Sequence, residues 1–544
     1  MKKLLLAVFL FAICIVKTEA QITDPFFDHV FYVGAFDQGS DWTQGWTNWD
    51  PDNTTYPATT VTVSGNITTN TTWTSSNVYL LSGFVRVKSG ATLTIQPGTV
   101  IRGDKTSMGS LFIERGAYLY AVGTSSQPIV FTSNEPATTR YYGDWGGIIL
   151  CGKADMNVPG DTALYEGLTD LYYGGGSSVN NNDSSANMKY VRLEFGGVAL
   201  QPNKEINGIT FGACGDHTRI DYIQVSYAGD DSYEWFGGNV NVKHLIAYKG
   251  LDDDFDTDFG YHGNLQFLVS LRDPNEADVS GSNGFESDND ASGSTNSPQT
   301  KPIFSNVSVY GPKATSGTTI SSNYKRSMHL RRNCQTSVYN SVFAGYPTGL
   351  TIDGALTEGS YQNGGLVISH TILSGSTATK FFAIGTCLTT AQDSLNRLTA
   401  VRTKFKEVAY HNDTLADNTS LMIVDPFNQS ATPNFLPQAG SPVLNRSIWF
   451  SVSTNDLSSN VMNLCNYPNP FSGKTVIRYT LSEATSVNIE VYDLFGKKVA
   501  ALVNETQNDG EYGIEFDAQS FSKGMYLARI TTSTGTRSLK MIIQ

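Results

Sequence analysis

Basic charge is scarce in this sequence of 544 residues, which has 37 Lys and Arg against 50 Asp and Glu. The net charge of −13 leaves no basic stripe to neutralise phosphates, and this argues against a nucleic-acid partner. Charged residues of both signs make up only 16%, and no long stretch shows an apolar repeat of 3.6 residues. With 51 glycines, the composition favours short strands and many turns over helices.

Long apolar runs are also lacking after the N-terminus. One apolar run, residues 4–16, follows Lys2 and Lys3 and leads to a small residue, Ala20. This pattern predicts a secretory signal peptide over residues 1–20. The apolar run is too short to cross a membrane, and no other segment is apolar enough to do so. We therefore expect an exported chain without a membrane span.

Cysteines are few and scattered. Of the six, Cys14 falls within the predicted signal peptide, and the other five show no CxxC spacing. A structural zinc site is therefore not expected. Five cysteines form at most two disulfides, so we expect the apolar core rather than a disulfide framework to stabilise the fold. The sequence also lacks a Ser-His-Asp order, a phosphate-binding loop and a dinucleotide fingerprint.

Short alternating strands, separated by Gly, Pro or Asn, fill the middle of the chain. Units that resemble one another start at Tyr190, Tyr222, His244 and Leu265, at steps of 32, 22 and 21 residues. A loose period near 22 is typical of a solenoid whose coils stack on one another. We predict an all-β fold with a right-handed parallel β-helix over residues 81–453.

Within each coil, residues such as Val191 and Ile223 should point into the core, and residues such as Arg192 and Gln224 should face solvent. A repeated Asn, Ser or Asp at a turn should stack on its equivalent one coil away. A β-propeller is the alternative, but its blades need about 40 residues each, and the shorter step disfavours it. Residues 389–410 fit a helix or a long insertion.

The segment between the signal peptide and the solenoid, residues 21–80, contains a tryptophan cluster formed by Trp42, Trp46 and Trp49. Exposed aromatic rings on an exported protein can form a platform on which sugars stack. The other interpretation, which we favour, is an N-terminal cap that covers the open end of the solenoid. Pro-containing segments near residues 426–437 are expected to close the far end.

The last part of the chain differs in character. After a polar linker, residues 454–465, the segment 466–544 shows clean two-residue alternation over several strands with Gly turns. Its charges balance, with eight acidic and eight basic residues, so the acidity belongs to the solenoid. This pattern predicts a small antiparallel, Ig-like β-sandwich.

Segment 466–544 resembles the type A C-terminal sorting domain of the type IX secretion system of Bacteroidetes. The stretches that carry the resemblance are Tyr467–Phe471, Val491–Asp493 followed by Gly496, Gly524–Tyr526 and Lys540–Ile543. The resemblance implies the type IX secretion machinery as a partner and a secreted or outer-surface location. The solenoid, with Asp144–Ile149 and Gly229–Asp231, looks like a family of secreted β-helix proteins of unassigned activity.

Acidic residues concentrate in residues 229–293, which hold fourteen acidic and three basic side chains. Like charges at this density are destabilising unless cations or solvent compensate them. Asp288, Asp290 and Ser292 match the first half of an EF-hand-type loop, although Gln299 stands where the bidentate acid belongs. Calcium is the expected cofactor, and the candidate ligands are Asp230, Asp231, Asp252, Asp254, Asp256, Asp258, Asp288, Asp290 and Ser292.

Two other interpretations of this stretch stay open. In the first, the solenoid is a polysaccharide lyase or glycoside hydrolase, because right-handed β-helices carry such enzymes; the candidate catalytic residues are Asp230, Asp231, His262 and Arg331. Tyr261 stands where the hydrolase pattern has Gly, and fold analogy is a weak argument. In the second, the acids are solvated turn residues that bond backbone N–H groups. We favour a binding or structural protein, adhesin-like or glycan-binding, over an enzyme.

Overall fold

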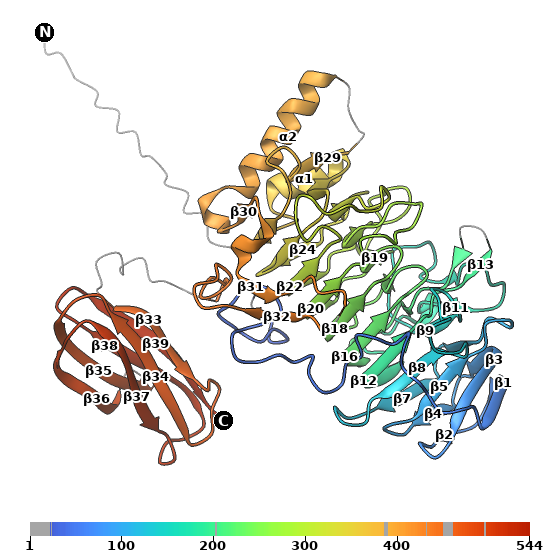
Figure 1. Ribbon diagram of the computed structural model, residues 1–544, viewed down its shortest axis with the longest axis horizontal. Helices are drawn as coiled ribbons and strands as arrows, with labels where there is room; N and C mark the ends of the chain where they lie inside the picture. Colours follow the sequence, from blue (N-terminus) through green and yellow to red (C-terminus); the bar gives the residue numbers. More distant parts are fainter. Residues whose placement is uncertain are drawn as a thin grey trace, which may run out of the picture. The chain divides into compact units, whose positions relative to one another are not determined.

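The computed structural model describes residues 22, 24–201, 204–385, 390–430, 432–449, 461–493 and 497–544. The predicted signal peptide, residues 1–20, lies outside the described residues, as do Cys387 and much of the predicted linker. The chain divides into two compact units, the first of which ends at Trp449 (Figure 1).

The first unit is a parallel β-helix, which confirms the predicted fold class. Its 26 strands join into one system in which every pairing is parallel, and Figure 1 shows the coils stacked side by side. The first coil begins at Val61, about twenty residues before the predicted start of the helix. The strands are β1 (Val61–Ile67), β2 (Thr71–Trp73), β3 (Val78–Val87), β4 (Thr92–Ile95), β5 (Val100–Gly103), β6 (Ser110–Ile113), β7 (Tyr118–Val122), β8 (Ile129–Ser133), β9 (Gly147–Cys151), β12 (Ala186–Glu194), β15 (Ile209–Gly212), β16 (Arg219–Ser226), β17 (Tyr233–Phe236), β18 (Val242–Tyr248), β19 (Phe255–Asp258), β20 (Asn264–Leu271), β21 (Phe285–Ser287), β22 (Ile303–Tyr310), β23 (Arg326–Leu330), β24 (Ser337–Tyr339), β25 (Val342–Ala344), β26 (Thr348–Ile352), β27 (Ile368–Ser369), β28 (Ile372–Ser374), β29 (Phe382–Ile384) and β30 (Asp413–Leu415).

The core of the β-helix is a set of apolar rows, one residue per coil. One row pairs Val191 with Ile223, Ile223 with Leu245 and Leu245 with Leu268, and all four side chains are fully buried. The predicted inward positions are thus confirmed. The predicted alignment set Leu245 opposite Gln266, so the true register is shifted by two residues, a shift that keeps each side chain on its predicted face.

The bend between the two halves of each long strand repeats from coil to coil. One residue per coil adopts a left-handed conformation, which is unusual outside glycine. The stacked rings of Tyr190 and Tyr222 lie 4.6 Å apart, and those of Tyr222 and His244 lie 4.2 Å apart, so ring packing offsets the backbone cost. The residues at this position are Tyr190, Tyr222, His244, Phe267, Asn306, Asn340 and His370, with φ between 48° and 61°.

Residues 24–56 run along the outer side of the β-helix, across β12 to β22. The side-chain amide of Gln266 accepts from the N–H of Asp28 and donates to its carbonyl, both over 2.8 Å. In the same way, the side-chain amide of Gln224 accepts from the N–H of Asn48 at 2.9 Å and donates to its carbonyl at 2.8 Å. This segment, which we call the strap, therefore lies along a side of the helix, whereas the sequence predicted a cap over its end.

The tryptophans of the strap pack into the protein. Trp46 is only 2% exposed, and its ring meets those of Tyr190 and Tyr222 edge-on, so this ring does not form the sugar platform that was the less favoured interpretation of the sequence. Trp42 stacks on Phe36 at 5.4 Å. The strap also covers Gln224, which is 1% exposed, and the prediction that this residue faces solvent is wrong for the same reason.

A second apolar core lies outside the helix, between the strap and a hairpin near the end of this unit. The hairpin strands are β31 (Ile423–Asp425) and β32 (Asn434–Pro437). Phe435 of β32 stacks on Phe36 of the strap at 5.2 Å and on Tyr310 of β22 at 5.4 Å. The hairpin therefore seals a side of the β-helix rather than its far end, where the sequence placed it.

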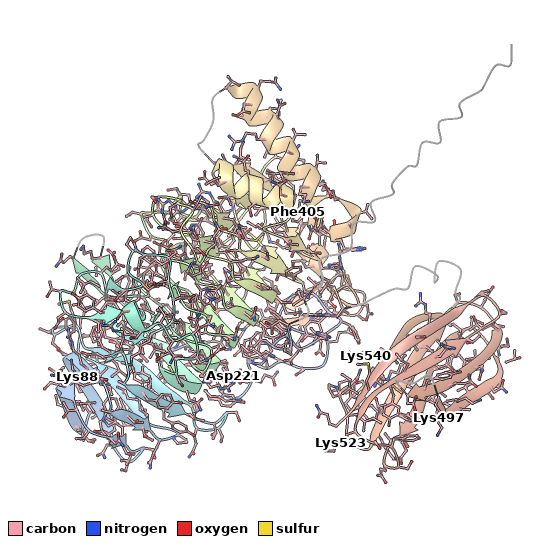
Figure 2. All side chains as sticks on the ribbon, turned by 180° about the vertical axis from the view of Figure 1, so that it is seen from behind. Lys88, Asp221, Phe405, Lys497, Lys523 and Lys540 are labelled. Carbon is pink, nitrogen blue, oxygen red and sulfur yellow. The ribbon has the colours of Figure 1, made fainter. Side chains whose placement is uncertain are left out.

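Two α-helices lie at the end of the coil stack farthest from β1: α1 (Ala355–Asn363) and α2 (Ala391–Phe405). For residues 389–410, where the sequence left a helix or a long insertion open, the structure has the helix α2. Phe405, labelled in Figure 2, packs against Phe382 with ring centroids 5.1 Å apart. Within the described part of the chain, no helix has the length and apolar character that a membrane crossing requires. The 3-10 helices are η1 (Gly176–Ser178), η2 (Val408–Tyr410) and η3 (Asn418–Leu421).

Two small hairpins project beside β9 and β15, formed by β10 (Ala163–Leu164) with β11 (Tyr172–Tyr173) and by β13 (Ala199–Gln201) with β14 (Lys204–Glu205). The first covers the outer face of its neighbours, because Tyr173 stacks on Phe236 at 5.8 Å. The cysteines that the structure describes are all free: Cys151, Cys214, Cys334 and Cys465.

The second unit is a small β-sandwich, which confirms the prediction for the C-terminal segment. One antiparallel sheet has the order β33–β34–β37 and the other β36–β35–β38–β39. Buried residues such as Ile477 and Val491 alternate with exposed ones along the strands. The strands are β33 (Val461–Tyr467), β34 (Lys474–Leu481), β35 (Thr485–Asp493), β36 (Lys498–Gln507), β37 (Gly510–Asp517), β38 (Gly524–Thr531) and β39 (Thr536–Ile543).

Candidate functional site

Four of the predicted acidic ligands stand on the turns just before two paired strands, β17 and β19: Asp230, Asp231, Asp252 and Asp254. The strands pair in register, so Asp231 lies beside Asp253, 22 residues later. The carboxylate of Asp231 accepts the backbone N–H of Asp253 over 2.8 Å, and that of Asp253 accepts the N–H of Asn283 on the following coil over 2.5 Å. The predicted stacking of Asp and Asn at successive turns is therefore confirmed.

A row of polar side chains follows on the outer face of the same strands, one residue per coil. Parallel strands lie about 4.8 Å apart, so each side chain is within reach of the next. Three consecutive coils contribute acids to this row, and the next coil contributes a histidine. Its members, in paired order from β15 to β26, are Thr210, Glu234, Asp256, Glu286, His329 and Thr351.

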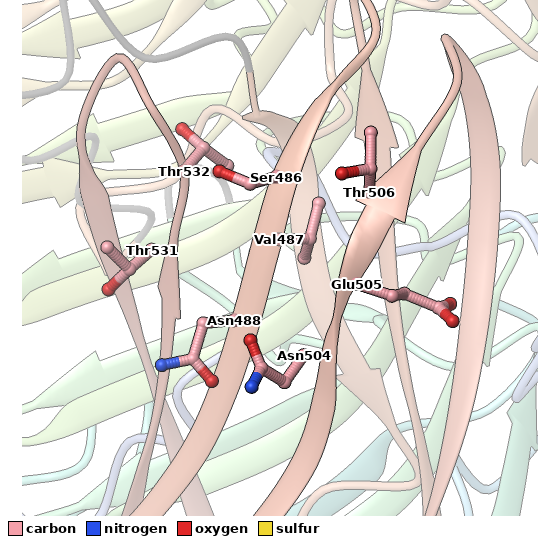
Figure 3. A pocket seen from close by; sticks show the side chains of 8 residues that line it. All are labelled: Ser486, Val487, Asn488, Asn504, Glu505, Thr506, Thr531 and Thr532. Carbon is pink, nitrogen blue, oxygen red and sulfur yellow. The ribbon is translucent and has the colours of Figure 1, made fainter.

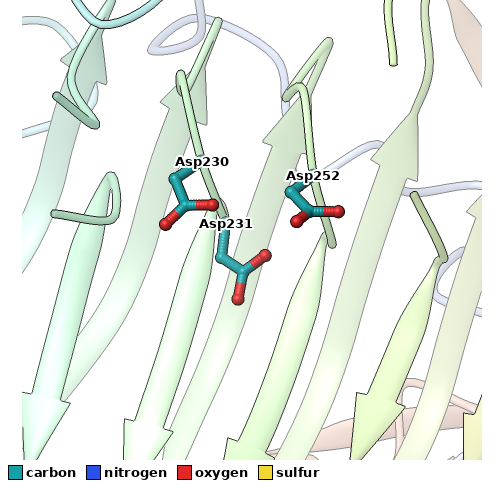
Figure 4. A group of neighbouring side chains, drawn as sticks. All are labelled: Asp230, Asp231 and Asp252. Atoms are coloured by element: carbon teal, nitrogen blue, oxygen red, sulfur yellow. The ribbon is translucent and has the colours of Figure 1, made fainter. Parts of the chain in front are cut away.

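Two groups of carboxylates converge at the acidic end of this row. In one group, drawn in Figure 4, oxygens of Asp230, Asp231 and Asp252 lie within 4.8 Å of one another. In the other, oxygens of Asp231, Glu234 and Asp256 meet the same limit. Asp231 belongs to both groups, so it connects the acids on the turns with the row of acids on the strands. Either group has the geometry to hold a metal ion.

The carboxylates of these groups are strongly coupled by their charges. Burial raises the pKa of Asp256 well above its ordinary value, and the nearby charge of Glu286 raises it further. Burial likewise raises the pKa of Glu234, with Asp256 as the next cause. The Oδ1 atom of Asp256 is buried and has no hydrogen-bond partner. A carboxylate oxygen in this state is poorly satisfied, and a cation would satisfy it.

Acidic residues of the two projecting hairpins add negative charge beside the converging carboxylates. Burial and the charge of Glu205 raise the pKa of Glu166 to about 7. Both residues also act on Asp230, whose pKa is raised first by burial and then by Asp252. Because these hairpins stand beside the converging acids, they form one wall of the candidate site.

Farther along the row, Glu286 stands in a network of polar contacts with His329 and Arg331. His329 Nδ1 lies 2.8 Å from Glu286, and its Nε2 lies 3.4 Å from Asp353. Burial acts to raise the pKa of Glu286, but the hydrogen bond with His329 and the charge of Arg331 outweigh it, so the pKa lies below its ordinary value. Glu286 is therefore ionised beside Asp256, whose pKa is raised.

Several predicted ligands lie outside the two converging groups. Asp254 accepts from the Arg272 guanidinium over 2.8 Å, and both side chains are fully buried. Asp258 has its pKa raised to about 8, by burial and then by the charge of Asp288. Asp288 itself is bound by two guanidinium groups, those of Arg331 and Arg332 at 2.8 and 2.7 Å.

The half EF-hand pattern forms a self-contained turn. Asp290 accepts hydrogen bonds from the backbone N–H and hydroxyl of Ser292, at 2.9 and 2.6 Å, and from the N–H of Ser294 at 3.1 Å. The pKa of Asp290 is lowered because these bonds outweigh burial. The oxygens that would face an ion thus bond the loop's own donors.

The predicted catalytic residues are not gathered in one place. Asp230 and Asp231 precede the strands, whereas His262 follows β19, so they lie at opposite ends of the coil. His262 bonds the carbonyl of Gly260 over 2.8 Å. Arg331 is held by Asp288 and Glu286, and the charges of these acids, acting against burial, raise its pKa further above the ordinary value. Arg331 is therefore a poor base.

Two carboxylates of the row, Glu234 and Glu286, were not among the predicted ligands or catalytic residues. Glu234 stands inside β17 between two buried aromatic residues, Tyr233 and Trp235, and Glu286 stands inside β21 next to Phe285. The coil period was the available signal, since a step of 22 residues from Glu234 leads to Asp256.

The second unit has a hollow of about 260 Å³ on its larger sheet (Figure 3). Its lining is mostly hydroxyl and amide side chains, and it contains one carboxylate and no basic residue. No converging set of titratable groups lies there, so the chemistry of interest belongs to the β-helix. The lining residues are Ser486, Val487, Asn488, Asn504, Glu505, Thr506, Thr531 and Thr532.

Comparisons with protein families match both units. A family model described as "Pectate-lyase like beta helix domain" matches residues 65–418. A second model, described as "Secretion system C-terminal sorting domain", matches residues 466–544. No curated protein matches the chain. The family matches confirm the β-helix and the sorting domain that the sequence predicted.

Two solved structures resemble the chain at low identity. The enzymatically active domain of tailspike protein 4 of bacteriophage CBA120 is 9% identical, with a TM-score of 0.23 over 88% of this chain and 62% of that one. A modular endo-β-1,4-mannanase from Cellulomonas fimi is 11% identical, with a TM-score of 0.14 over 45% of this chain and 63% of that one. This chain spans less than two thirds of either structure, and neither likeness bears on its function.

Proposed function

This chain belongs to the family of pectate-lyase like β-helix domains, and on that premise we propose that it is an exported binding protein whose acidic coil face holds a calcium ion. The C-terminal sorting domain directs it through the type IX secretion machinery to the outside or the outer surface of the cell. The proposal concerns what the exported β-helix does there.

The convergence of Asp231, Glu234 and Asp256 carries this proposal. Their oxygens lie within 4.8 Å of one another on two neighbouring coils, and one of them, Asp256 Oδ1, is buried without a hydrogen-bond partner. Three ionised carboxylates at this spacing repel one another strongly, so part of their charge must be neutralised by protons or by a cation. A bound divalent ion would turn that repulsion into a favourable interaction.

The ligand chemistry favours calcium among the divalent ions. Both converging groups consist of carboxylates alone, without the histidine or cysteine that zinc and copper prefer. Calcium takes six to eight oxygens in flexible geometry, and backbone carbonyls and water can complete its shell. Magnesium demands a stricter octahedron, which carboxylates fixed on separate coils are less able to provide.

Thermal unfolding with calcium, magnesium or a chelator tests the proposal. Calcium at a hundredfold excess over Kd should stabilise the folded state by about 2.7 kcal/mol and raise Tm by several degrees. In the Asp256→Asn and Asp231→Asn variants most of this rise should be lost. Asp425→Asn is the matched control, since Asp425 is exposed on β31, and it should keep the full response. An unchanged Tm in calcium would contradict the proposal.

Polysaccharide cleavage is the second candidate, and one observation favours it. Asp256 and Glu286 pair in register, and their environments move their pKa values in opposite directions, upward for Asp256 and downward for Glu286. A protonated acid beside an ionised one is the arrangement that glycoside hydrolysis requires. Such an enzyme would use this pair, with Asp256 as the acid.

Sugar release from a panel of uronate and neutral polysaccharides decides between the candidates. A cleaving enzyme should release reducing ends, and Glu286→Gln and Asp256→Asn should each abolish the release while Asp425→Asn keeps it. A binding protein should show no turnover on any member of the panel. Release that survives both substitutions would rule out this pair as the catalytic site.

A further inference from the structure

A separate hollow of about 150 Å³ lies beside the first projecting hairpin, away from the converging acids. It is lined by Glu114 and Arg115, which follow β6, and by Asp170, Leu171 and Tyr172 of the hairpin. Tyr172 is 42% exposed, whereas Leu171 beside it is only 1% exposed. The hollow thus has a buried apolar floor and an accessible aromatic ring.

The polar groups of the hollow are fixed in place by ion pairs. Arg86 donates two hydrogen bonds to Asp170, at 2.7 and 2.9 Å, and Lys88 donates to Glu114 over 2.6 Å. Arg115 donates to the carbonyl of Gly174 over 2.9 Å. Preformed polar groups cost little ordering entropy when a ligand binds.

The hairpin that carries Tyr172 is also firmly held. Its next residue, Tyr173, is 3% exposed and stacks on Phe236 of β17. The guanidinium carbon of Arg115 lies 5.8 Å from the centre of the Tyr172 ring. The ring therefore sits on a rigid support, and an aromatic side chain that is left half exposed on such a support is available for a ligand.

We propose that this hollow binds one unit of a neutral sugar chain, with Tyr172 as the stacking ring and Glu114, Arg115 and Asp170 as hydroxyl partners. Acceptors and donors stand side by side around the hollow, and this suits hydroxyl groups, which both donate and accept. The carboxylates are already paired with basic groups, so the hollow offers no strong excess of one charge for an ionic ligand.

The size of the hollow fits the same conclusion. Pockets for drug-sized ligands measure about 300–1,000 Å³, so a hollow of about 150 Å³ holds a single ring and leaves the rest of a chain in solvent. An exported protein meets such chains outside the cell. The site is independent of the proposed calcium site, because none of its residues belongs to the converging carboxylates.

Affinity electrophoresis of the full chain tests the proposal, in gels cast with xylan, galactomannan, laminarin or polygalacturonate and run in chelator. We expect at least one of the three neutral polysaccharides to retard the protein, and polygalacturonate to leave its mobility unchanged. The chelator keeps the proposed calcium site empty, so the retardation reports on the sugar site alone. If the chain binds no calcium, the retardation should be unchanged.

Substitutions then locate the site. Tyr172→Ala should weaken binding at least tenfold, and Tyr172→Phe, which keeps the ring, should retain it. Tyr120→Ala is the matched control, since Tyr120 is equally exposed, at 41%, but lies on β7 outside the hollow. Retardation by none of the neutral polysaccharides, retardation by polygalacturonate alone, or unchanged binding by a folded Tyr172→Ala protein would each overturn the proposal.

Discussion

The guanidinium of Arg272 and the carboxylate of Asp254 form an ion pair with an N–O distance of 2.8 Å, and neither side chain is accessible to solvent. Arg272 also donates to the carbonyl of Leu251 over 3.0 Å and lies over the ring of Tyr324, 5.3 Å from its centre. The two opposite charges compensate each other, which explains how two ions can stand inside the β-helix. The pair has a structural role, and Asp254 is therefore not available as a ligand of the proposed cation.

Removing one member of this pair should be strongly destabilising. Arg272→Met leaves an uncompensated buried carboxylate, and we expect the free energy of unfolding to fall by about 3–5 kcal/mol. The double variant Arg272→Met/Asp254→Leu should recover much of that loss, because no charge remains buried. Urea unfolding of the β-helix measures both values, and a double variant no more stable than the single one would contradict this account.

The charge of Asp258 should make the β-helix less stable as pH rises when calcium is absent. Its folded pKa of about 8 lies above the ordinary 3.8, so the folded state holds a proton that the unfolded state has released. Stability therefore falls between pH 4 and 8, by about 1.4 kcal/mol per pH unit at most.

The Asp258→Asn variant should lack this component, since an amide does not ionise and can still accept the N–H of Phe259. Urea unfolding in chelator at pH 5 and pH 8 is the measurement. Relative to the wild type, the Asp258→Asn variant should have a larger free energy of unfolding at pH 8 than at pH 5, whereas Asp425→Asn should show no such difference. Equal pH dependence in variant and wild type would rule out Asp258 as the cause.

His370 should have the opposite effect on the pH dependence. Burial, followed by the charges of His411 and Arg446, lowers its pKa from 6.5 to about 3. Below pH 6.5 the unfolded chain binds a proton that the folded chain does not, so stability falls as pH falls, by about 2–3 kcal/mol between pH 6.5 and 4.5.

A matched variant is available at this position. Asn occupies the equivalent left-handed position on the two preceding coils, as Asn306 and Asn340, so His370→Asn keeps a suitable backbone. Its unfolding midpoint should depend less on pH than that of the wild type, with the exposed His217→Asn as control. An unchanged slope between pH 6.5 and 4.5 would show that His370 does not titrate as described.

The strap depends on a buried contact at its C-terminal end. The hydroxyl of Tyr56 lies 2.8 and 2.9 Å from the two carboxylate oxygens of Glu194, which is 1% exposed. Tyr56→Phe removes this donor and leaves the acid poorly satisfied, at a cost of about 1–3 kcal/mol. Tyr141→Phe, at an exposed ring, should cost little, and similar unfolding midpoints for the two variants would contradict a role for this contact.

The sequence contained enough to predict the β-helix itself. The apolar rows exist because every coil needs the same inward pattern, and that repetition is visible without coordinates in Val191, Ile223 and Leu245. The same step placed Asp231 and Asp253 on neighbouring turns. The acid-rich turns could therefore be brought together by counting, without knowing any contact.

Contacts between distant segments could not be predicted in this way. Nothing in the sequence links Asp28 to Gln266, or Phe36 to Phe435, because the strap and the last hairpin meet the helix outside its repeat. Asp254 looked like a ligand because its partner, Arg272, stands 18 residues away on another side of the coil. The sequence therefore showed which acids the site contains, but it did not show which of them form ion pairs with basic residues.

The position of the strap also sets an order on how this protein is completed during its synthesis. The N–H of Val33 bonds the carbonyl of Val443 and the N–H of Gly34 bonds that of Asn340, both over 2.7 Å. Val33 and Gly34 can therefore acquire these neighbours only after the chain has been made as far as Val443. The strap takes its final position on the β-helix only once the last segment of the first unit is present.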